Sequence, residues 1–361
     1  MRLLMVNSAW PQSWGGGEKW FVEAVRWFSA RGHDVRLVGR PHSRLCETAR
    51  SLGFDVRETV FGGDFDPLAV LRAREIIAEF RPDLIVVNFN KEACQFGFAA
   101  KARHLPLVAR HGFPLFKNRF HHRLLLKHFI TRLIVNAADL REEYRRMGFP
   151  TDEVDVILNG TAVIEQRRGE LRKRFQIAPD DLLILAAGRL ESQKKFNRVI
   201  EIVEALLPGR PTLRCLIAGE GPLRDELESQ IRAKDLSTHI RFAGFVHDLS
   251  SVCGDADLFL LTSDQEGTPN VLLEVMAAGV PCVSFAVGSV PEILTGNLSA
   301  NVIEPGDVQA MTRWSAALLD NPELRAAMSR DERRKVESDL SLNASMSQYE
   351  KVFEKVIQSL A

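Results

Sequence analysis

The stretch DADLFLLTSDQEGTPNVLLEVMAAGVPCV (residues 255–283) carries the clearest structural pattern of the chain. Its apolar run Leu258–Leu261 is typical of a strand that is buried on both faces of a parallel sheet. Residues 268–270 (Thr-Pro-Asn) and 279–281 (Gly-Val-Pro) are typical start and stop signals of a helix. The stretch therefore predicts a strand, a polar loop and a helix, which is the repeating unit of a parallel α/β fold.

Two glutamates stand in this unit, Glu266 in the polar loop and Glu274 inside the predicted helix. Backbone N–H groups at a helix start attract phosphate. A carboxylate one or two turns down the same helix can reach past the phosphate to a ribose. The segment therefore predicts a site for a nucleotide.

The same alternation of short apolar runs and helical patterns continues through all 361 residues and predicts two doubly wound halves with a cleft between them. A charged stretch at 165–174 is the expected linker, which gives domains at 1–165 and 166–340 and a last helix within 341–361. The strands are expected at 3–6, 35–38, 56–60, 84–87, 107–109, 133–135, 154–157, 182–186, 213–218, 240–242, 258–261, 281–284 and 301–303.

Three further loops stand between an expected strand and an expected helix. The first holds Gly15, Gly16 and Gly17, and glycines let a backbone approach a ligand closely; a tight turn explains it equally. The second is GRLESQK (188–194), whose Arg189 and Lys194 are placed to bind a diphosphate unless they are ordinary surface cations. The third, 219–222 (Gly-Glu-Gly-Pro), needs only a structural explanation.

Composition narrows the class of protein. Formal net charge is zero, and five cysteines are scattered singly, which favours reduced thiols in a cytoplasmic protein over a disulfide framework. No stretch reaches the roughly 20 apolar residues that span a bilayer. The first loop is not G-x-G-x-x-G, and Gly39-Arg40 follows the second strand where a dinucleotide-binding fold has an acid. An NAD-dependent dehydrogenase is therefore disfavoured.

One segment of the first half is strongly basic. Residues 93–138 contain no acid, and residues 101–132 carry eight Lys or Arg and five His. Its later part mixes Phe and Leu with cations at roughly helical spacing, which is typical of a helix in peripheral contact with an anionic membrane. A solvated basic face or a groove for an anionic acceptor explains it as well. No nucleic-acid-binding motif accompanies the charge.

Together these motifs resemble the retaining GT-B glycosyltransferases of family 4, also called group 1, many of which make lipopolysaccharide, capsule or glycolipid. The resemblance covers nearly the whole chain. Its marks are GRLESQK (188–194), AGEGPLRDEL (218–227), FAGFV (242–246), the stretch at 255–283, and PEIL (291–294). Lys195 and Ser289 depart from it, since glycines are usual there. Lys195 leaves open whether residue 194 or 195 supplies the cation.

The resemblance implies a fold of two Rossmann-like domains, an acceptor-side domain at 1–165 and a donor-binding domain at 166–340, with the last helix packed on the first. It implies a hexosyltransferase (EC 2.4), with Glu266 orienting the transferred sugar, Arg189 and Lys194 neutralising the diphosphate, and His111 reaching the sugar or acceptor. The expected donor-binding residues are Glu274, Gly16, Gly17, Gly267, Thr268, Pro269, Asn270, Phe245 and Val246.

The expected substrates are a nucleotide sugar, UDP-linked by default, and an anionic saccharide or lipid-linked acceptor. Front-face attack by the acceptor would retain the anomeric configuration without an essential protein base, whereas a double displacement would need a protein nucleophile. No cofactor and no metal are expected, because Asp64 and Asp66 lie away from the site and Asp255 and Asp257 match scaffold positions. The alternatives are a GT-B nucleotide-sugar epimerase and a non-catalytic nucleotide-sugar-binding protein.

Overall fold

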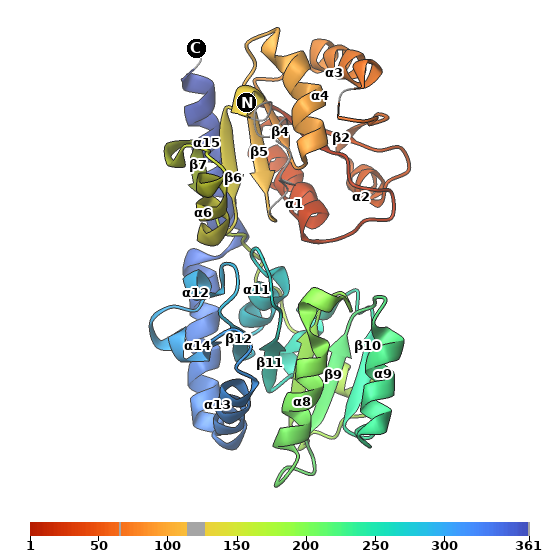
Figure 1. Ribbon diagram of the computed structural model, residues 1–361, viewed down its shortest axis with the longest axis vertical. Helices are drawn as coiled ribbons and strands as arrows, with labels where there is room; N and C mark the ends of the chain where they lie inside the picture. Colours follow the sequence, from red (N-terminus) through yellow and green to blue (C-terminus); the bar gives the residue numbers. More distant parts are fainter. Residues whose placement is uncertain (65, 114–126, 360–361) are drawn as a thin grey trace. The chain divides into compact units, whose positions relative to one another are not determined.

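The computed structural model describes residues 1–64, 66–113 and 127–359, which form two compact units joined by two chain crossings (Figure 1). Unit 1 consists of Met1–Asn159 together with the segment from Asn343 onward, and unit 2 is Gly160–Leu342. The predicted boundaries at 165/166 and 340/341 lie close to these divisions.

Among the described residues, unit 1 has a seven-stranded sheet in the order β3-β2-β1-β4-β5-β6-β7, and its paired strands are parallel. The chain begins in the middle of the sheet, so the strand order reverses between β1 and β4. The strands are β1 (Arg2–Asn7), β2 (Asp34–Gly39), β3 (Asp55–Glu58), β4 (Leu84–Val87), β5 (Leu107–His111), β6 (Arg132–Val135) and β7 (Val154–Val156).

Helices flank this sheet (Figure 1), and polar groups fix where they begin. The Asp66 side chain accepts the Leu68 N–H and caps the helix that starts at Pro67. The first helix starts at Gly16, and Glu18 accepts the Gly15 N–H at 2.8 Å, which stabilises this start. The helices are α1 (Gly16–Ala30), α2 (Arg44–Ser51), α3 (Pro67–Phe80), α4 (Asn90–Lys101), α6 (Ala138–Arg146) and α15 (Leu342–Gln358), with the 3₁₀ turn η1 (Thr151–Glu153).

Unit 2 has a six-stranded sheet in the described chain, in the order β10-β9-β8-β11-β12-β13, again with parallel pairs. Its strand order reverses between β8 and β11. The strands are β8 (Leu183–Ala187), β9 (Arg214–Ala218), β10 (Ile240–Gly244), β11 (Leu258–Leu261), β12 (Cys282–Phe285) and β13 (Val302–Ile303).

The helical elements of unit 2 flank its sheet in the same way (Figure 1). The α-helices are α7 (Glu170–Arg174), α8 (Phe196–Leu206), α9 (Arg224–Ala233), α10 (Leu249–Val252), α11 (Asn270–Ala277), α12 (Val290–Ile293), α13 (Val308–Asp320) and α14 (Pro322–Asp339). The 3₁₀ turns are η2 (Ser192–Lys194), η3 (Cys253–Asp255) and η4 (Gly296–Asn301). No described helix combines the length and the apolar character that crossing a bilayer requires.

The last helix, α15, packs on unit 1 through one apolar face. Tyr349 and Phe353 are fully buried. The Phe353 ring stacks on Phe28 of α1 with a centroid distance of 5.5 Å, and the Tyr349 ring lies 4.8 Å from that of Trp20. The predicted return of this helix to the first domain is therefore confirmed.

The chain enters and leaves unit 2 along adjacent segments. The Thr161 N–H donates to the Leu340 carbonyl at 3.0 Å, and the Leu342 N–H donates to the Thr161 carbonyl at 2.9 Å. A Cβ atom on Gly160 would lie 2.4 Å from the Ser341 carbonyl oxygen. Only glycine therefore permits this close approach of the two segments.

Each of the thirteen predicted strands overlaps a strand of the structure, and the predicted fold class of two doubly wound, Rossmann-like domains is confirmed. The prediction works because both faces of these sheets are covered. A strand covered on both faces needs a continuous apolar run, as in β4, where all four residues are buried.

Candidate active site

The centre of the unit 2 sheet brings two of the predicted loops together. β8 and β11 are paired strands, with Leu258 beside Ile184, and the strand order reverses between them. In open α/β sheets, ligands bind outside the carboxyl ends of the strands at such a reversal. The loop after β8 carries Arg189 and Lys194, and the loop after β11 carries Glu266.

Lys194 and Glu266 form a buried ion pair at this point. The Lys194 Nζ lies 2.6 Å from Glu266 Oε1, and the Ser263 hydroxyl donates to the same oxygen at 2.6 Å. Only 15% of the lysine side chain and 4% of the glutamate side chain are exposed. Because two donors meet on one carboxylate oxygen, the position of Glu266 is fixed before any ligand binds.

The side chain of Lys195 does not join this pair. Its backbone is left-handed, with φ of 52°, and its Nζ lies 3.4 Å from Asp264, which also pairs with Arg198. Lys194, not Lys195, is thus the lysine that contacts Glu266. The catalytic role of Lys194 stays a prediction.

Arg189 stands apart from this buried pair. Three quarters of its side chain is exposed, and its guanidinium lies 3.2 Å from Glu191 within the same loop. A surface ion pair of this kind contributes little to stability. Its guanidinium is therefore available to a ligand at small cost.

A glycine stands at the carboxyl end of each of the neighbouring strands β8, β9 and β10. Gly188 and Gly219 directly follow β8 and β9, and Gly244 is the last residue of β10. Gly219 has φ of 143°, and a Cβ there would lie 1.8 Å from the Gly188 carbonyl oxygen. The backbones of the two loops therefore approach each other closely at this point, which only glycine permits.

Glu274 lies in the second turn of α11, half-buried, and Pro269 is the residue that precedes the helix. The predicted helix-start residues Thr268, Pro269 and Asn270 thus stand at its beginning. The turn ahead of them is held by the loop after β12. The Gly267 carbonyl accepts the Ser289 N–H at 3.0 Å and the Ser289 hydroxyl at 3.2 Å.

Gly288 fits beneath the same turn, since a Cβ there would lie 2.4 Å from the carbonyl oxygens of Glu266 and Gly267. Ser289, which departs from the usual glycine, therefore adds a hydrogen bond rather than disturbing the loop. Sequence reasoning assigned no role to Ser263 and Ser289. A hydroxyl three residues before Glu266 was the available signal for Ser263.

The two predicted base-bordering residues differ in exposure. Phe245, directly after β10, is 44% exposed and its ring lies edge-on to His247 at 4.6 Å. Val246 is 7% exposed. Only Phe245 presents a substantial surface to a ligand.

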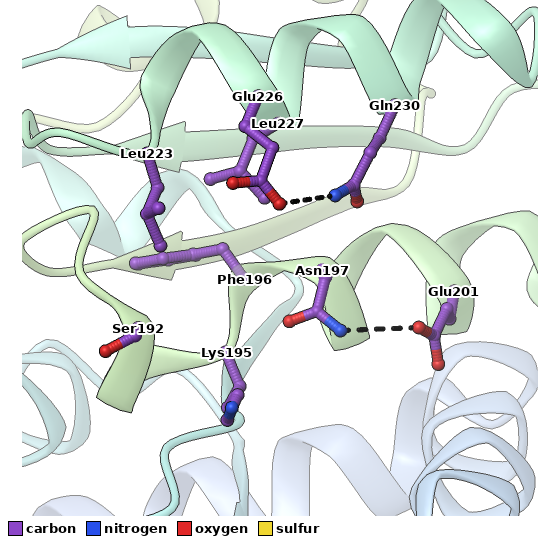
Figure 2. Close-up of a pocket in the computed structure, with 9 residues that line it drawn as sticks. All are labelled: Ser192, Lys195, Phe196, Asn197, Glu201, Leu223, Glu226, Leu227 and Gln230. Atoms are coloured by element: carbon purple, nitrogen blue, oxygen red, sulfur yellow. Dashed lines mark hydrogen bonds between the residues drawn. The ribbon is translucent and has the colours of Figure 1, made fainter.

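A separate groove of about 390 Å³ lies between α8 and α9 (Figure 2). Figure 2 shows Asn197 bonded to Glu201 and Gln230 bonded to Glu226 along its two walls. None of the predicted site residues lines it. Its polar walls are already paired, so we assign it no part in the reaction.

In unit 1, the glycine loop also stands at a reversal of strand order, between β1 and β4. A Cβ on Gly17 would lie 3.5 Å from the Asn88 side chain, which follows β4. Glu92 of α4 is fully buried here and accepts backbone N–H groups of Ser8, Asn88 and Phe89. It thereby ties the ends of β1 and β4 together.

Burial raises the pKa of Glu92 to about 7, although the backbone donors oppose that shift. Sequence reasoning missed this residue. Its signal was its place at the third position of a helix, where a glutamate commonly accepts N–H groups of the residues that precede the helix.

His111 is the last residue of β5 rather than the residue after it, and its side chain is fully buried. Its Nδ1 lies 2.7 Å from the Tyr144 hydroxyl. Burial, helped by the charge of Arg110, lowers the pKa of His111 to about 3. The imidazole is therefore neutral near pH 7 and is no cation of the basic segment.

Residues 114–126 of the basic segment 101–132, which include His121 and His122 and most of the stretch predicted to contact a membrane, lie outside the described residues. Of its described cations, Arg132 pairs with Asp155 at 2.6 Å. Arg110 is buried and donates to Asn159 at 2.7 Å.

The two Asp pairs serve local structure. Asp255 accepts the Leu171 and Arg172 N–H groups at the start of α7, and Asp257 pairs with Arg172 at 2.8 Å. Asp66 caps α3. Within the described parts of the chain, no three His, Cys, Asp or Glu side chains gather as a metal site would need.

Comparison with known proteins divides the chain in the same two parts. Residues 14–163 match the family model described as Glycosyltransferase Family 4, and residues 167–335 match that of Glycosyl transferases group 1. The lipopolysaccharide core biosynthesis glycosyltransferase LpsD of Rhizobium meliloti (strain 1021) is 24% identical over 87% of this chain and 88% of its own. The amylovoran biosynthesis glycosyltransferase AmsK of Erwinia amylovora is 28% identical over 58% of this chain and 53% of its own.

The solved structure of Anabaena Alr3699/HepE in complex with UDP has the same fold, with a TM-score of 0.87. Its sequence is 18% identical, and the match covers 98% of this chain and all of that one.

Proposed function

Because the chain belongs to the glycosyltransferases of family 4 and group 1, with the GT-B fold, we propose that it transfers a hexosyl group from a UDP-linked donor. We propose a saccharide or lipid-linked acceptor in the synthesis of a cell-surface glycan. UDP is present in the solved Anabaena structure, and the names of LpsD and AmsK refer to lipopolysaccharide core and amylovoran synthesis.

The observation that carries this proposal is the buried Lys194–Glu266 pair at the strand-order reversal of unit 2. The Lys194 ammonium neutralises the diphosphate that leaves with the nucleotide, and the exposed Arg189 adds a second cation. Charge that develops on a leaving group is stabilised most by cations already in position. Lys194 is such a cation because Glu266 holds it.

Glu274 binds the ribose hydroxyls of the donor in this proposal. It lies one turn beyond the start of α11, and the positive end of a helix dipole favours a phosphate. A carboxylate one turn down this helix can reach past a bound phosphate to the ribose hydroxyls. Phe245 borders the base with its exposed ring.

The reaction retains the anomeric configuration by front-face attack, without a protein nucleophile. Glu266 is the carboxylate in the site that a double displacement would use. Its Oε1 already accepts hydrogen bonds from Lys194 and Ser263, and each of them withdraws electron density from that oxygen. Such a carboxylate is suited to orient sugar hydroxyls rather than to attack the anomeric carbon.

Intact-mass measurement after incubation with the donor alone tests this choice. We expect the unmodified mass of the protein at all times. An added mass of one hexosyl group, lost in Glu266→Gln, would establish a covalent intermediate and contradict front-face attack.

The remaining parts of the proposal concern location and the other substrate. We propose that the enzyme acts in the cytoplasm and that its acceptor, or an anionic membrane surface, meets the basic segment at 101–132. An epimerase is less well supported, because the imidazole of His111 is too weakly basic to exchange protons at a sugar carbon.

A further inference from the structure

Two tryptophans and two arginines form an aromatic and cationic surface beside the glycine loop of unit 1. Trp10 is 70% exposed, the largest exposed fraction among the large apolar side chains of the described chain. Exposed apolar surface that is bordered by polar or charged groups is typical of ligand-binding sites. Trp10 is therefore a candidate contact for a ligand.

Arg40 lies over Trp10 in a fixed position. Its Cζ is 4.8 Å from the centre of the Trp10 ring and 5.5 Å from that of Phe61. Its Nε donates to the Ser8 carbonyl at 2.7 Å, and another nitrogen donates to the Phe61 carbonyl at 3.3 Å. The guanidinium is thus anchored by backbone groups, and no carboxylate of the described residues pairs with it.

Arg44, four residues further along the sequence and at the start of α2, repeats the arrangement. Its Cζ lies 4.9 Å from the centre of the Trp14 ring. Among the described residues, neither Arg40 nor Arg44 forms an ion pair, whereas Arg36 and Arg50 of the same unit pair with Asp55 and Glu58. Burial lowers the pKa of Arg40, and the charge of the fully buried Glu92 partly opposes this shift. Neither guanidinium is therefore neutralised by a direct ion pair among the described residues of this surface.

These residues stand at the edge of the sheet where substrates bind in this fold class. Trp10 follows β1 and Arg40 follows β2, and the ends of these strands, Asn7 and Gly39, are paired in the sheet. α1 begins at Gly16 on the same edge, at the reversal of strand order between β1 and β4.

We propose that Trp10, Trp14, Arg40 and Arg44 form an acceptor subsite for an anionic saccharide. This inference rests on the proposed function, which gives unit 1 the acceptor. An indole ring packs against the C–H face of a pyranose, and its negative face favours the slightly positive C–H groups. A guanidinium binds a carboxylate or a phosphate with two parallel hydrogen bonds. The combination selects a sugar that carries such a group.

The test measures saccharide binding by calorimetry with three hexasaccharide probes. The probes are oligogalacturonate, maltohexaose phosphorylated on its terminal sugar, and unmodified maltohexaose. We expect at least one acidic probe to bind the wild type about tenfold or more tightly than maltohexaose, which corresponds to about 1.4 kcal/mol. The acidic probe that binds identifies carboxylate or phosphate as the anion.

Substitutions then assign the binding to this surface. We expect Trp10→Ala to weaken binding of the acidic probe about tenfold, and Trp10→Phe to keep most of the wild-type affinity. Arg44→Gln should remove the preference for the acidic probe. Arg50→Gln, which removes the same charge from the same helix at a paired position, is the matched control and should bind like the wild type. Arg40 is left intact because it also bonds to the backbone.

Three results would overturn the subsite: no acidic probe binds the wild type, maltohexaose binds as tightly, or Trp10→Ala and Arg44→Gln bind like the wild type. A thermal shift with UDP, measured on each variant, separates this inference from the proposed function. If a variant loses saccharide binding but keeps the UDP shift, the substitution has affected the subsite and not the donor site. Absence of a UDP shift in the wild type contradicts the donor proposal, whatever the saccharides do.

Discussion

At the scale of single residues, two neighbouring lysines have different partners, and only one of them lies in the proposed site. Lys194 contacts the buried Glu266, and Lys195 contacts the exposed Asp264. We expect Lys194→Gln to slow UDP release from the donor roughly a hundredfold, the usual loss when one positioned donor to developing charge is removed.

Lys195→Gln is the control, because it removes the same charge one residue away. It should release UDP at close to the wild-type rate. If both variants lose activity equally, the loss reflects net charge in the loop. If only Lys195→Gln loses it, the assignment of the cation to residue 194 is wrong.

His111 supports a second prediction at this scale. Because the pKa of its imidazole is lowered to about 3, His111 is too weak a base to be required for proton removal at neutral pH. We expect His111→Ala to slow UDP release without abolishing it. Tyr144→Phe, which removes the hydroxyl that contacts His111, should behave like the wild type or nearly so. Complete loss of turnover in a His111→Ala protein with an unchanged melting temperature would make His111 an essential base.

The limits of sequence reasoning are clearest at these residues. The loops at 188–194 and 262–270 were predicted from their place after apolar strands, and the pairing of β8 with β11 brings them together. Which lysine enters the site depends on the left-handed backbone of Lys195, which the packing of two loops imposes. Burial of His111 and Glu92 depends on long-range contacts, and no periodic pattern reports it. The assigned roles of the site residues remain predictions.

At the scale of elements, the apolar strands could be predicted and the polar contacts between elements could not. β11 was predicted to the residue because Asp257 and Thr262 border an apolar run. The loop at 219–222 was expected to precede a helix directly, but α9 begins only at Arg224. Backbone hydrogen bonds hold the residues ahead of α9 instead: the Leu190 N–H donates to the Glu220 carbonyl at 2.9 Å, and the Leu223 N–H donates to the Leu190 carbonyl at 3.1 Å.

One such contact makes stability depend on pH. Glu332 of α14 is fully buried, and its Oε1 accepts the Cys282 N–H of β12 and the Asn301 amide, each at 3.0 Å. Burial raises the pKa of Glu332 from 4.5 to about 8. Between these values the folded protein binds more protons than the unfolded chain, so the free energy of unfolding falls as pH rises.

Glu332→Gln keeps the accepting oxygen and cannot ionise. We expect the stability of this variant, relative to the wild type, to rise by roughly 1 kcal/mol per pH unit between pH 5 and 8. Urea unfolding of both proteins across this range measures the difference, and the opposite effect of His111 cancels because both proteins contain it. A difference that is constant with pH would show that Glu332 ionises normally in the folded state.

At the scale of the whole molecule, the last helix of the chain returns to unit 1 and packs on it. α15 buries Met346, Tyr349 and Phe353 against unit 1, and Glu350 pairs with Arg31 at 2.9 Å. We expect Phe353→Ala to lower the free energy of unfolding by about 3–5 kcal/mol, the usual cost of removing a buried aromatic ring. The matched change at an exposed site, Phe245→Ala, should leave the apo protein nearly unchanged.

Truncation after Leu340 removes the whole of α15 and should lower the melting temperature more than either substitution. A truncated protein with the wild-type melting temperature would mean that α15 does not stabilise unit 1, contrary to the buried contacts of its apolar face.

Nucleotide binding tests most directly whether unit 2 contains the donor site. The measurement is the melting temperature with UDP, GDP, ADP or CDP, with and without EDTA, for the wild type and for Glu274→Ala. A ligand that binds only the folded state raises the melting temperature. We expect a shift with UDP that persists in EDTA and is lost in Glu274→Ala. Absence of a shift with every nucleotide, or an equal UDP shift in the variant, would contradict the placement of the donor site in unit 2.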